Sequence, residues 1–321
     1  MRVSVIVPVY DDAANIAECV CALKAVAPDA ELIVVDDGST DDSAAVAARG
    51  GARVVRQARN AGAAAARNAG AHAAAGEILV FVDADVVAAP DAVARLVGVL
   101  DANPELAAVF GSYDDTPRAP GLVSQYRNLL HHFVHQHGAD GASTFWAGLG
   151  AVRRTAFDLV GGFDPRVRGI EDIELGYRLR AKGFRIRLDP RIQGTHLKRW
   201  TLASVLRTDA FMRALPWSRL LVAGGAALDH LNVTTSQRAS VALVLLAVVA
   251  APLAVLVPGL AIVSAAALVA VVALNRRLFA FFARRRGVAF AIATVPLVFL
   301  YYVESGLAYA WAWLERRLSR G

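Results

Sequence analysis

Two short apolar runs that each end in acidic residues constrain the fold of this chain most. Glu77–Val82 is followed by Asp83-Ala84-Asp85, and Glu31–Val35 is followed by Asp36-Asp37-Gly38. Uninterrupted apolar strands are typical of parallel sheets, which are buried on both faces, and ligands bind beyond the carboxyl ends of such strands. Carboxylates at those ends suit a hard cation that bridges a diphosphate. A single Asp-x-Asp is more often a solvated turn, but the repetition favours a metal–phosphate site.

Predicted strands and helices alternate over the first two thirds of the chain. The predicted strands lie at 2–8, 31–35, 52–56, 77–82, 106–110 and 184–188, and the predicted helices at 12–27, 61–75, 90–100, 125–137, 171–182 and 201–215. We expect the first strand to end at Pro8, because proline cannot donate to a central ladder. The alternation predicts an α/β fold, a mostly parallel sheet with flanking helices joined by right-handed crossovers.

A third acidic pair begins the helix predicted at 171–182. Glu171 and Asp172 are favoured in a first helical turn by the helix dipole alone, but together with the two strand-end pairs they are candidates for a general base. His131 and His135 share a face of the helix at 125–137. No metal-ligand signature surrounds them, so a packed or substrate-lining helix is favoured over a zinc site. The apolar residues 145–150 fit the floor of a pocket.

The last third of the sequence is apolar enough to enter a bilayer. Val241–Leu274 contains no charged residue and exceeds the roughly 20 residues of one span. Pro258-Gly259 lies near its middle and fits the turn of a tight hairpin. A second run, Val288–Leu314, is interrupted only by Glu304. The sequence therefore predicts three spans, at about 241–257, 259–274 and 288–314.

The arginines between and after these runs bear on orientation. Five arginines follow the first run, at positions 276, 277, 284, 285 and 286. The positive-inside rule places them in the cytoplasm with the enzymatic part, if the first run crosses twice. A basic C-terminus then lies outside, unless the second run re-enters. We expect a cytoplasmic catalytic domain at 1–220, an interfacial linker at 221–238 and a transmembrane region at 239–321.

Composition agrees with a membrane-attached protein. Hydrophobic residues make up 56% of the chain and the mean hydropathy is +0.44. The net charge of +6 lies partly in the juxtamembrane arginines, which suit an anionic leaflet of the lipid bilayer, so nothing calls for a nucleic-acid partner. Cys19 and Cys21 are two residues apart on a predicted helix and point apart, which predicts free thiols in a reducing compartment.

The ordered set of motifs resembles the family 2 glycosyltransferases, inverting enzymes with the GT-A fold. The resemblance covers about residues 2–215, and the C-terminal extension resembles the membrane-attached branch of that family. The motifs are Val5–Tyr10, Val35–Ser39, Asn60-Ala61-Gly62, Ala66–Gly70, Asp83-Ala84-Asp85, Gly161–Asp164 and Glu171-Asp172.

This resemblance implies a nucleotide-sugar donor site. Pro8, Tyr10 and Asp12 would line the base pocket, although Asp12 stands where many relatives have Glu. Asp37 would bind the uracil or ribose, Asp36 would support its loop, and Arg67 would also bind the donor. Asp83 would contact the ribose, or the metal through a water molecule. Asp85 would coordinate the Mg2+ or Mn2+ that binds the diphosphate.

The resemblance also implies the residues of the reaction and the acceptor side. Asp172, or less favoured Glu171, would be the general base. His196 resembles the metal-proximal histidine of some members, and a purely structural histidine is as well supported. The acceptor side would contain Gly148, Trp146, Arg199 and Trp200.

The sequence His196-Leu197-Lys198-Arg199-Trp200 departs from the family's processive polysaccharide synthases, which carry Gln-x-x-Arg-Trp. With too few spans for a polymer channel, the chain is expected to transfer single sugars, with a UDP-sugar favoured, to a lipid or glycan acceptor at the membrane. A processive synthase subunit and a non-catalytic membrane scaffold are the alternatives. A nucleotidyltransferase is disfavoured, because Asp11-Asp12 stands where a basic triphosphate loop would be needed. Sugar, acceptor and oligomeric state stay open.

Overall fold

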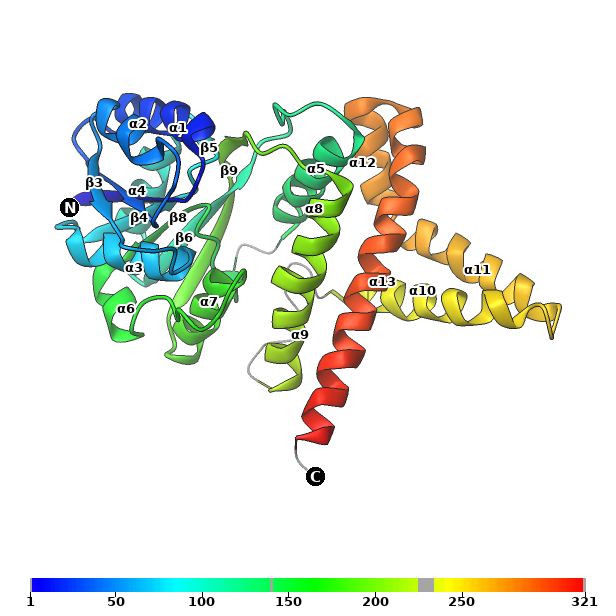
Figure 1. Ribbon diagram of the computed structural model, residues 1–321. Coiled ribbons are helices and arrows are strands. Elements are labelled where there is room, and N and C mark those ends of the chain that lie inside the picture. Colours follow the sequence, from blue (N-terminus) through cyan, green and yellow to red (C-terminus); the bar gives the residue numbers. More distant parts are fainter. Residues whose placement is uncertain (1, 139–140, 225–233, 320–321) are drawn as a thin grey trace. The chain divides into compact units, whose positions relative to one another are not determined.

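The computed structural model describes residues 2–319 except 139–140 and 225–233, and the chain divides into two compact units. The sheet unit comprises residues 1–120 and 135–199, and the helical unit comprises residues 121–134 and 200–321. Figure 1 shows the strands gathered in the first and only helices in the described part of the second.

The sheet unit is a mixed sheet flanked by helices, which confirms the predicted α/β class. Its strands are β1 (Val3–Val9), β2 (Glu31–Asp36), β3 (Arg53–Arg56), β4 (Ile78–Val82), β5 (Val86–Ala88), β6 (Leu106–Tyr113), β7 (Gly141–Ala142), β8 (Leu149–Arg153) and β9 (Arg185–His196). Its helices are α1 (Ala13–Val26), α2 (Ser43–Arg49), α3 (Ala63–Ala73), α4 (Ala92–Ala102), α6 (Arg154–Leu159) and α7 (Glu171–Ala181).

The strand order is β3-β2-β1-β4-β8-β6-β9-β5, with β7 paired to β9. Strands β1 to β4 are parallel, whereas β8 runs antiparallel to both β4 and β6. Strand β4 is fully buried at the centre of this sheet. Its carboxyl end, and those of β1 and β2, therefore open at one edge.

The structure corrects three details of the predicted sheet. Strand β1 continues through Pro8, which lies opposite Val35 of β2. Strand β4 pairs with β1 only as far as Ile6, so the missing N–H of Pro8 interrupts no hydrogen bond between β1 and β4. The last two residues of the region 145–150, predicted as a pocket floor, enter the sheet, since β8 begins at Leu149. The last strand, β9, continues to His196 rather than ending at 188.

The helical unit begins with most of α5 (Leu122–Gln136) and resumes after the sheet unit. Its other helices are α8 (Leu202–Arg207), the π-helix η1 (Thr208–Ala214), α9 (Leu215–Val222), α10 (Thr235–Leu253), α11 (Gly259–Leu274), α12 (Arg276–Arg286) and α13 (Val288–Leu318). The helix expected to stop near 215 continues to Val222, because Pro216 occupies the first turn of α9.

Helices α10 and α13 are long and apolar enough to cross a membrane. The pair α11 and α12 would make a third span only if both were counted as one helix, and the two are bent by 63° at Asn275. The described helices thus offer two or three candidate spans by length and composition, in the region where the sequence predicted three.

Candidate active site

The loops after β1 and β2 are held together by side-chain caps. Asp11, which has a positive φ of 48°, accepts from the backbone N–H of Thr40 at 2.7 Å, and this hydrogen bond lowers the pKa of Asp11. In return Ser39 Oγ accepts from the Asp11 N–H at 3.0 Å. Tyr10, next to this contact, is 47% exposed. A fixed, accessible aromatic ring of this kind suits stacking on a nucleotide base.

Asp37 and Asp36 lie at the end of β2 and serve the surrounding backbone. The two carboxylate oxygens of buried Asp37 accept from the N–H groups of Ala61 and Gly62, at 2.9 and 2.8 Å. Asp36 accepts from Ser39 N at 3.1 Å, which fits its predicted loop-supporting role. Gly38 is required at this turn, since its φ is +75° and a Cβ would lie 2.7 Å from the Arg59 carbonyl carbon.

Arg67 of α3 joins the end of β4 to the start of α7. It is only 5% exposed, and it donates to Asp83 Oδ1 and to Glu171 Oε1, each at 2.7 Å. Its guanidinium carbon lies 5.5 Å from the centre of the Phe163 ring. Burial alone would lower the pKa of Arg67, but the charges of Asp83 and Glu171 outweigh it and raise that pKa, so the guanidinium stays charged. Arg67, which was predicted to bind the donor, thus connects the acidic residue at the end of β4 with the one at the start of α7.

Glu171 and Asp172 have different environments. Glu171 is buried against Arg67, whereas Asp172 accepts from the backbone N–H of Ala147 at 3.2 Å and of Ile173 at 2.8 Å. Burial, followed by the Glu171 charge, raises the pKa of Asp172 to about 6. A carboxylate with a pKa near 6 is better suited to accept a proton than an ordinary aspartate.

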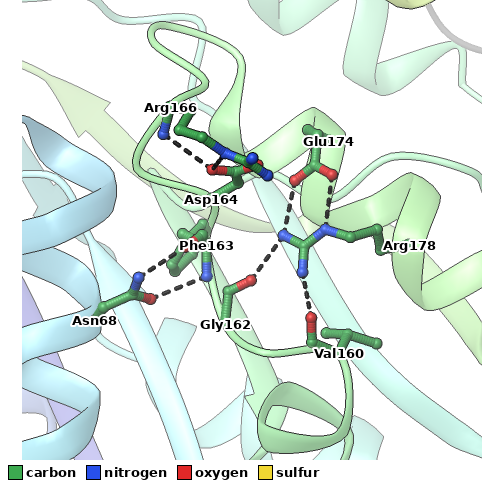
Figure 2. A network of polar contacts seen from close by, with 8 residues as sticks. All are labelled: Asn68, Val160, Gly162, Phe163, Asp164, Arg166, Glu174 and Arg178. Carbon is green, nitrogen blue, oxygen red and sulfur yellow. Dashed lines mark hydrogen bonds and ion pairs between the residues drawn. The ribbon is translucent and has the colours of Figure 1, made fainter.

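A polar network positions the turn that precedes α7 (Figure 2). The Asn68 side chain donates to Phe163 O at 2.7 Å and accepts from Phe163 N at 2.9 Å. Arg178 of α7 donates to Gly162 O at 2.7 Å and also bonds Glu174 and Val160 O. The motifs around Asn68 and Gly161–Asp164 therefore fix the geometry around Arg67 rather than offering free ligands.

Asp85 and His196 meet because β5 pairs with the end of β9. Val86 lies opposite His196, and His196 Nε2 is 3.3 Å from Asp85 Oδ2. Burial raises the pKa of Asp85, but the contact with His196 and the charge of Lys198 outweigh it, so that pKa lies below its ordinary value. The His196 ring stacks on Tyr113 with centroids 4.2 Å apart.

This pair fits a divalent cation that takes its other ligands from a diphosphate and water. Among the described residues, no three His, Cys, Asp or Glu side chains converge as a metal cage. A divalent ion at this edge would be held by Asp85 and His196. Asp83, which is bonded to Arg67, lies two residues before Asp85. Asp12 lies close enough for the Asp85 charge to raise its pKa, second to the effect of burial.

The histidines at 131–137 serve packing. His135 Nδ1 lies 3.0 Å from Gly111 O in the sheet unit, and the His132 ring stacks on Phe281 in the helical unit at 5.7 Å. These two contacts fit the packed helix favoured from the sequence.

The predicted acceptor-side residues are divided between the units. Trp146 is half-buried, and its ring lies 4.8 Å from Tyr113, while a Cβ on Gly148 would collide with the indole at 2.4 Å. Arg199 is exposed at the end of the sheet unit. Trp200 belongs to the helical unit, where its backbone N–H donates to Ser124 Oγ at 2.7 Å.

Sequence reasoning missed two residues of this edge. Lys198 is exposed; its charge opposes the burial that raises the pKa of Asp12 and adds to the His196 contact that lowers the pKa of Asp85. Tyr113 ends β6 and connects His196 to Trp146. Lys198 could have been predicted at this edge, because it follows His196 by two residues. Tyr113 could not, because only the pairing of β6 with β9 brings it next to His196.

Comparisons with known proteins agree with this geometry. Residues 4–161 match the model of glycosyl transferase family 2. A pre-mycofactocin glycosyltransferase of Mycobacterium tuberculosis is 28% identical over 221 residues, which cover 65% of this chain and 45% of that protein. An undecaprenyl-phosphate 4-deoxy-4-formamido-L-arabinose transferase of an Enterobacter species is 34% identical over 173 residues, 49% of this chain and 50% of that protein. The chain thus spans about half the length of these curated relatives.

Solved structures share the fold. A mannosyltransferase from Pyrobaculum calidifontis, in complex with GDP-Man and Mn2+, superposes with a TM-score of 0.60 at 22% identity and covers 97% of this chain and 87% of its own. A mycobacterial protein superposes with a TM-score of 0.51 at 24% identity, over 70% of this chain and 75% of its own. The family match, together with the motif order and the acidic edge of the sheet, shows that this chain carries a glycosyltransferase family 2 domain.

Proposed function

We propose that this enzyme transfers a sugar from a nucleotide-sugar donor, with a UDP-sugar favoured, to a lipid-linked or membrane-associated acceptor, with inversion at the anomeric carbon. The observation that carries the proposal is the bridge made by Arg67. One buried guanidinium holds Asp83, at the donor edge, and Glu171, beside Asp172, at 2.7 Å each. Such a bridge fixes the distance between a leaving-group site and a proton acceptor, as a displacement in one step requires.

Asp172 accepts the proton of the acceptor hydroxyl in this proposal. The acceptor oxygen forms its bond to the anomeric carbon as the bond to the diphosphate oxygen breaks, and the electron pair of that bond leaves with the nucleoside diphosphate. Inversion needs one such base. A divalent cation held by Asp85 and His196 would stabilise the charge on the leaving diphosphate. Lys198 and Arg199, both exposed after β9, supply further positive charge.

The donor base is assigned to the surface formed by Tyr10, with Pro8 and Asp12 beside it. Asp37 is assigned to the same pocket through the loop that it holds at Ala61 and Gly62. The apolar C-terminal helices, and the relatives named for undecaprenyl phosphate, support an acceptor carried by a membrane lipid. The catalytic domain is assigned to the cytoplasmic face, where nucleotide sugars would meet a basic membrane-proximal segment.

The test is a donor screen on the purified full chain in detergent. Release of nucleoside diphosphate from UDP- and GDP-sugars is followed with Mn2+ or Mg2+, with and without a membrane lipid extract. We expect release to need both metal and lipid, to be lost in Asp85→Ala, and to leave labelled sugar in an organic-extractable product. Label found in long polymer alone would favour the processive synthase. A folded protein inactive with every donor would favour the scaffold.

A further inference from the structure

The apolar helices of the helical unit are not parallel to one another. Figure 1 shows the hairpin of α10 and α11 running crosswise to the long helix α13. The contacts agree, because a Cβ on Gly306 of α13 would meet Leu245 and Val241 at 2.8 and 3.0 Å, both in the middle part of α10. The far end of the hairpin is open, with Val255 86% and Leu256 79% exposed. Helices that cross steeply cannot both follow the bilayer normal.

The hairpin is the part suited to the hydrocarbon. Residues 239–274 carry no charge, and Ser264 Oγ donates to Ala247 O at 3.1 Å where the two helices touch. The N–H groups of its turn are bonded internally, for example Leu256 to Leu253 O at 3.0 Å and Leu260 to Val257 O at 2.9 Å. Internal pairing of this kind is what a lipid environment demands of a backbone.

The second helix of the hairpin, α11, is short for a membrane span. Helix α11 has 16 residues, or about 24 Å of rise, against roughly 30 Å for the hydrocarbon core of a bilayer. Its tip, Val255–Gly259, has no polar side chain that would emerge on the far side. A hairpin with one arm of this length and an apolar tip fits a segment that turns back within the bilayer.

Helix α13 has the features of a helix that lies in the headgroup region. Glu304 is near the middle of its 31 residues, so a spanning helix would hold a half-buried carboxyl at the depth of the bilayer centre, which is costly unless it is paired. The second half exposes Tyr309, Trp311 and Trp313, and the Arg317 guanidinium lies 4.1 Å from the Trp313 ring. Exposed Trp and Tyr beside arginine are typical of the membrane–water interface.

We propose that α10–α11 is a re-entrant hairpin and that α12 and α13 lie along the headgroups of the same leaflet, so that the protein is monotopic. The arginines of α10 to α13 then lie on the side of the glycosyltransferase domain: Arg238 in the first turn of α10, five in α12, and Arg316 and Arg317 at the end of α13. The proposal removes the conflict with the positive-inside rule that three spans create, and it does not depend on the donor or acceptor.

Cysteine accessibility tests this topology in the full chain. Cys21 is exposed in the glycosyltransferase domain and marks its side, whereas Cys19 is buried, so Cys21→Ser gives the background for single sites. Ser319→Cys and Leu256→Cys in that background are treated with a membrane-impermeant maleimide in inverted vesicles and in spheroplasts. We expect Ser319→Cys to be labelled on the side that labels Cys21, and Leu256→Cys to be labelled on neither side until detergent is added.

Two outcomes would overturn the proposal: labelling of Ser319→Cys on the side opposite to Cys21, or labelling of Leu256→Cys from either face without detergent. Spin labels on Leu256→Cys and Leu307→Cys in nanodiscs give an independent measurement of depth. The label at Leu307, which is exposed on α13, should respond to a polar relaxation agent several-fold more than the label at Leu256. Equal depth at the two sites would show that α13 spans. Val257→Cys replaces Leu256→Cys if that variant does not accumulate.

Discussion

The Arg67 guanidinium donates to Glu171 at 2.7 Å, while the adjacent Asp172 accepts from the backbone of Ala147 and Ile173 instead. This difference separates two acids that are neighbours in the sequence. The Glu171 carboxylate is committed to the ion pair with Arg67, whereas the Asp172 carboxylate accepts from neutral backbone N–H groups. Asp172, with its raised pKa, is the better candidate for the general base.

Asp172→Asn should reduce kcat by about 100- to 10,000-fold, the usual contribution of a general base. The amide oxygen can still accept from Ala147, so the fold should persist. Nucleoside diphosphate release under saturating donor and acceptor measures the effect. Glu105→Gln, in an exposed ion pair with Arg185 at the amino ends of β6 and β9, is the matched control and should keep wild-type turnover. Full activity of Asp172→Asn beside an inactive Asp85→Ala would mean that the acceptor arrives ionised, as a phosphate does.

The pH dependence of kcat/KM should report the same group. The base must be deprotonated, so activity should rise with pH through about 6, the pKa of Asp172. Burial is the main cause of this raised pKa and the Glu171 charge adds to it, so Glu171→Gln should lower the pKa and move the acid limb to lower pH. Profiles of both proteins from about pH 4.5 to 8 measure the shift. An acid limb that stays in place or moves upward in Glu171→Gln would contradict the assignment.

The sequence predicted the edge of the sheet better than its interior connections. Asp83 and Asp85 follow a six-residue apolar run, so their place at a strand end was readable from local pattern. Strand β8 was missed, because Leu149–Arg153 follows small and apolar residues that read as a pocket floor. The bridge from Arg67 to Glu171 spans 104 positions, and no local pattern indicates which charges will meet across such a distance. Likewise, Tyr113 reaches His196 only because β6 and β9 are neighbours.

Replacing Arg67 should affect stability and activity differently according to the substitute. Arg67→Met leaves Asp83 and Glu171 without their shared cation, and loss of one partner of a buried ion pair costs about 3–5 kcal/mol. Arg67→Lys keeps the charge, but a single ammonium cannot reproduce the forked bridge. It should unfold closer to the wild type, yet with reduced kcat.

Thermal unfolding in detergent, followed by tryptophan fluorescence, compares the Arg67 variants. Arg53→Lys is the control, because Arg53 forms an exposed ion pair with Glu31, and such pairs contribute about 0–1 kcal/mol. If Arg67→Met were as stable as Arg53→Lys, the bridge would not hold the site together.

Activity should depend on a divalent metal through Asp85 and His196. Chelation should abolish nucleoside diphosphate release and Mn2+ should restore it. Tyr113→Leu removes the ring stacked 4.2 Å from His196, and loss of a group that orients a metal ligand costs about 10- to 100-fold in metal affinity. The Mn2+ concentration for half-maximal activity should rise accordingly, while kcat at saturating Mn2+ stays near that of the wild type. Activity that persists after chelation, or an unchanged Mn2+ titration in Tyr113→Leu, would contradict a metal site at Asp85 and His196.

Asp37 should matter for donor binding through the loop that it holds. Asp37→Ala leaves the N–H groups of Ala61 and Gly62 without their carboxylate acceptors, and an unsatisfied buried group costs about 1–3 kcal/mol. Since the loop borders the assigned base pocket, KM for the donor should rise more than kcat falls. Asp42→Ala is the matched control, because Asp42 is exposed and makes no side-chain cap at α2; such a change is usually within about 0.5 kcal/mol. Equal donor KM values in the two variants would show that Asp37 and its loop stand outside the nucleotide site.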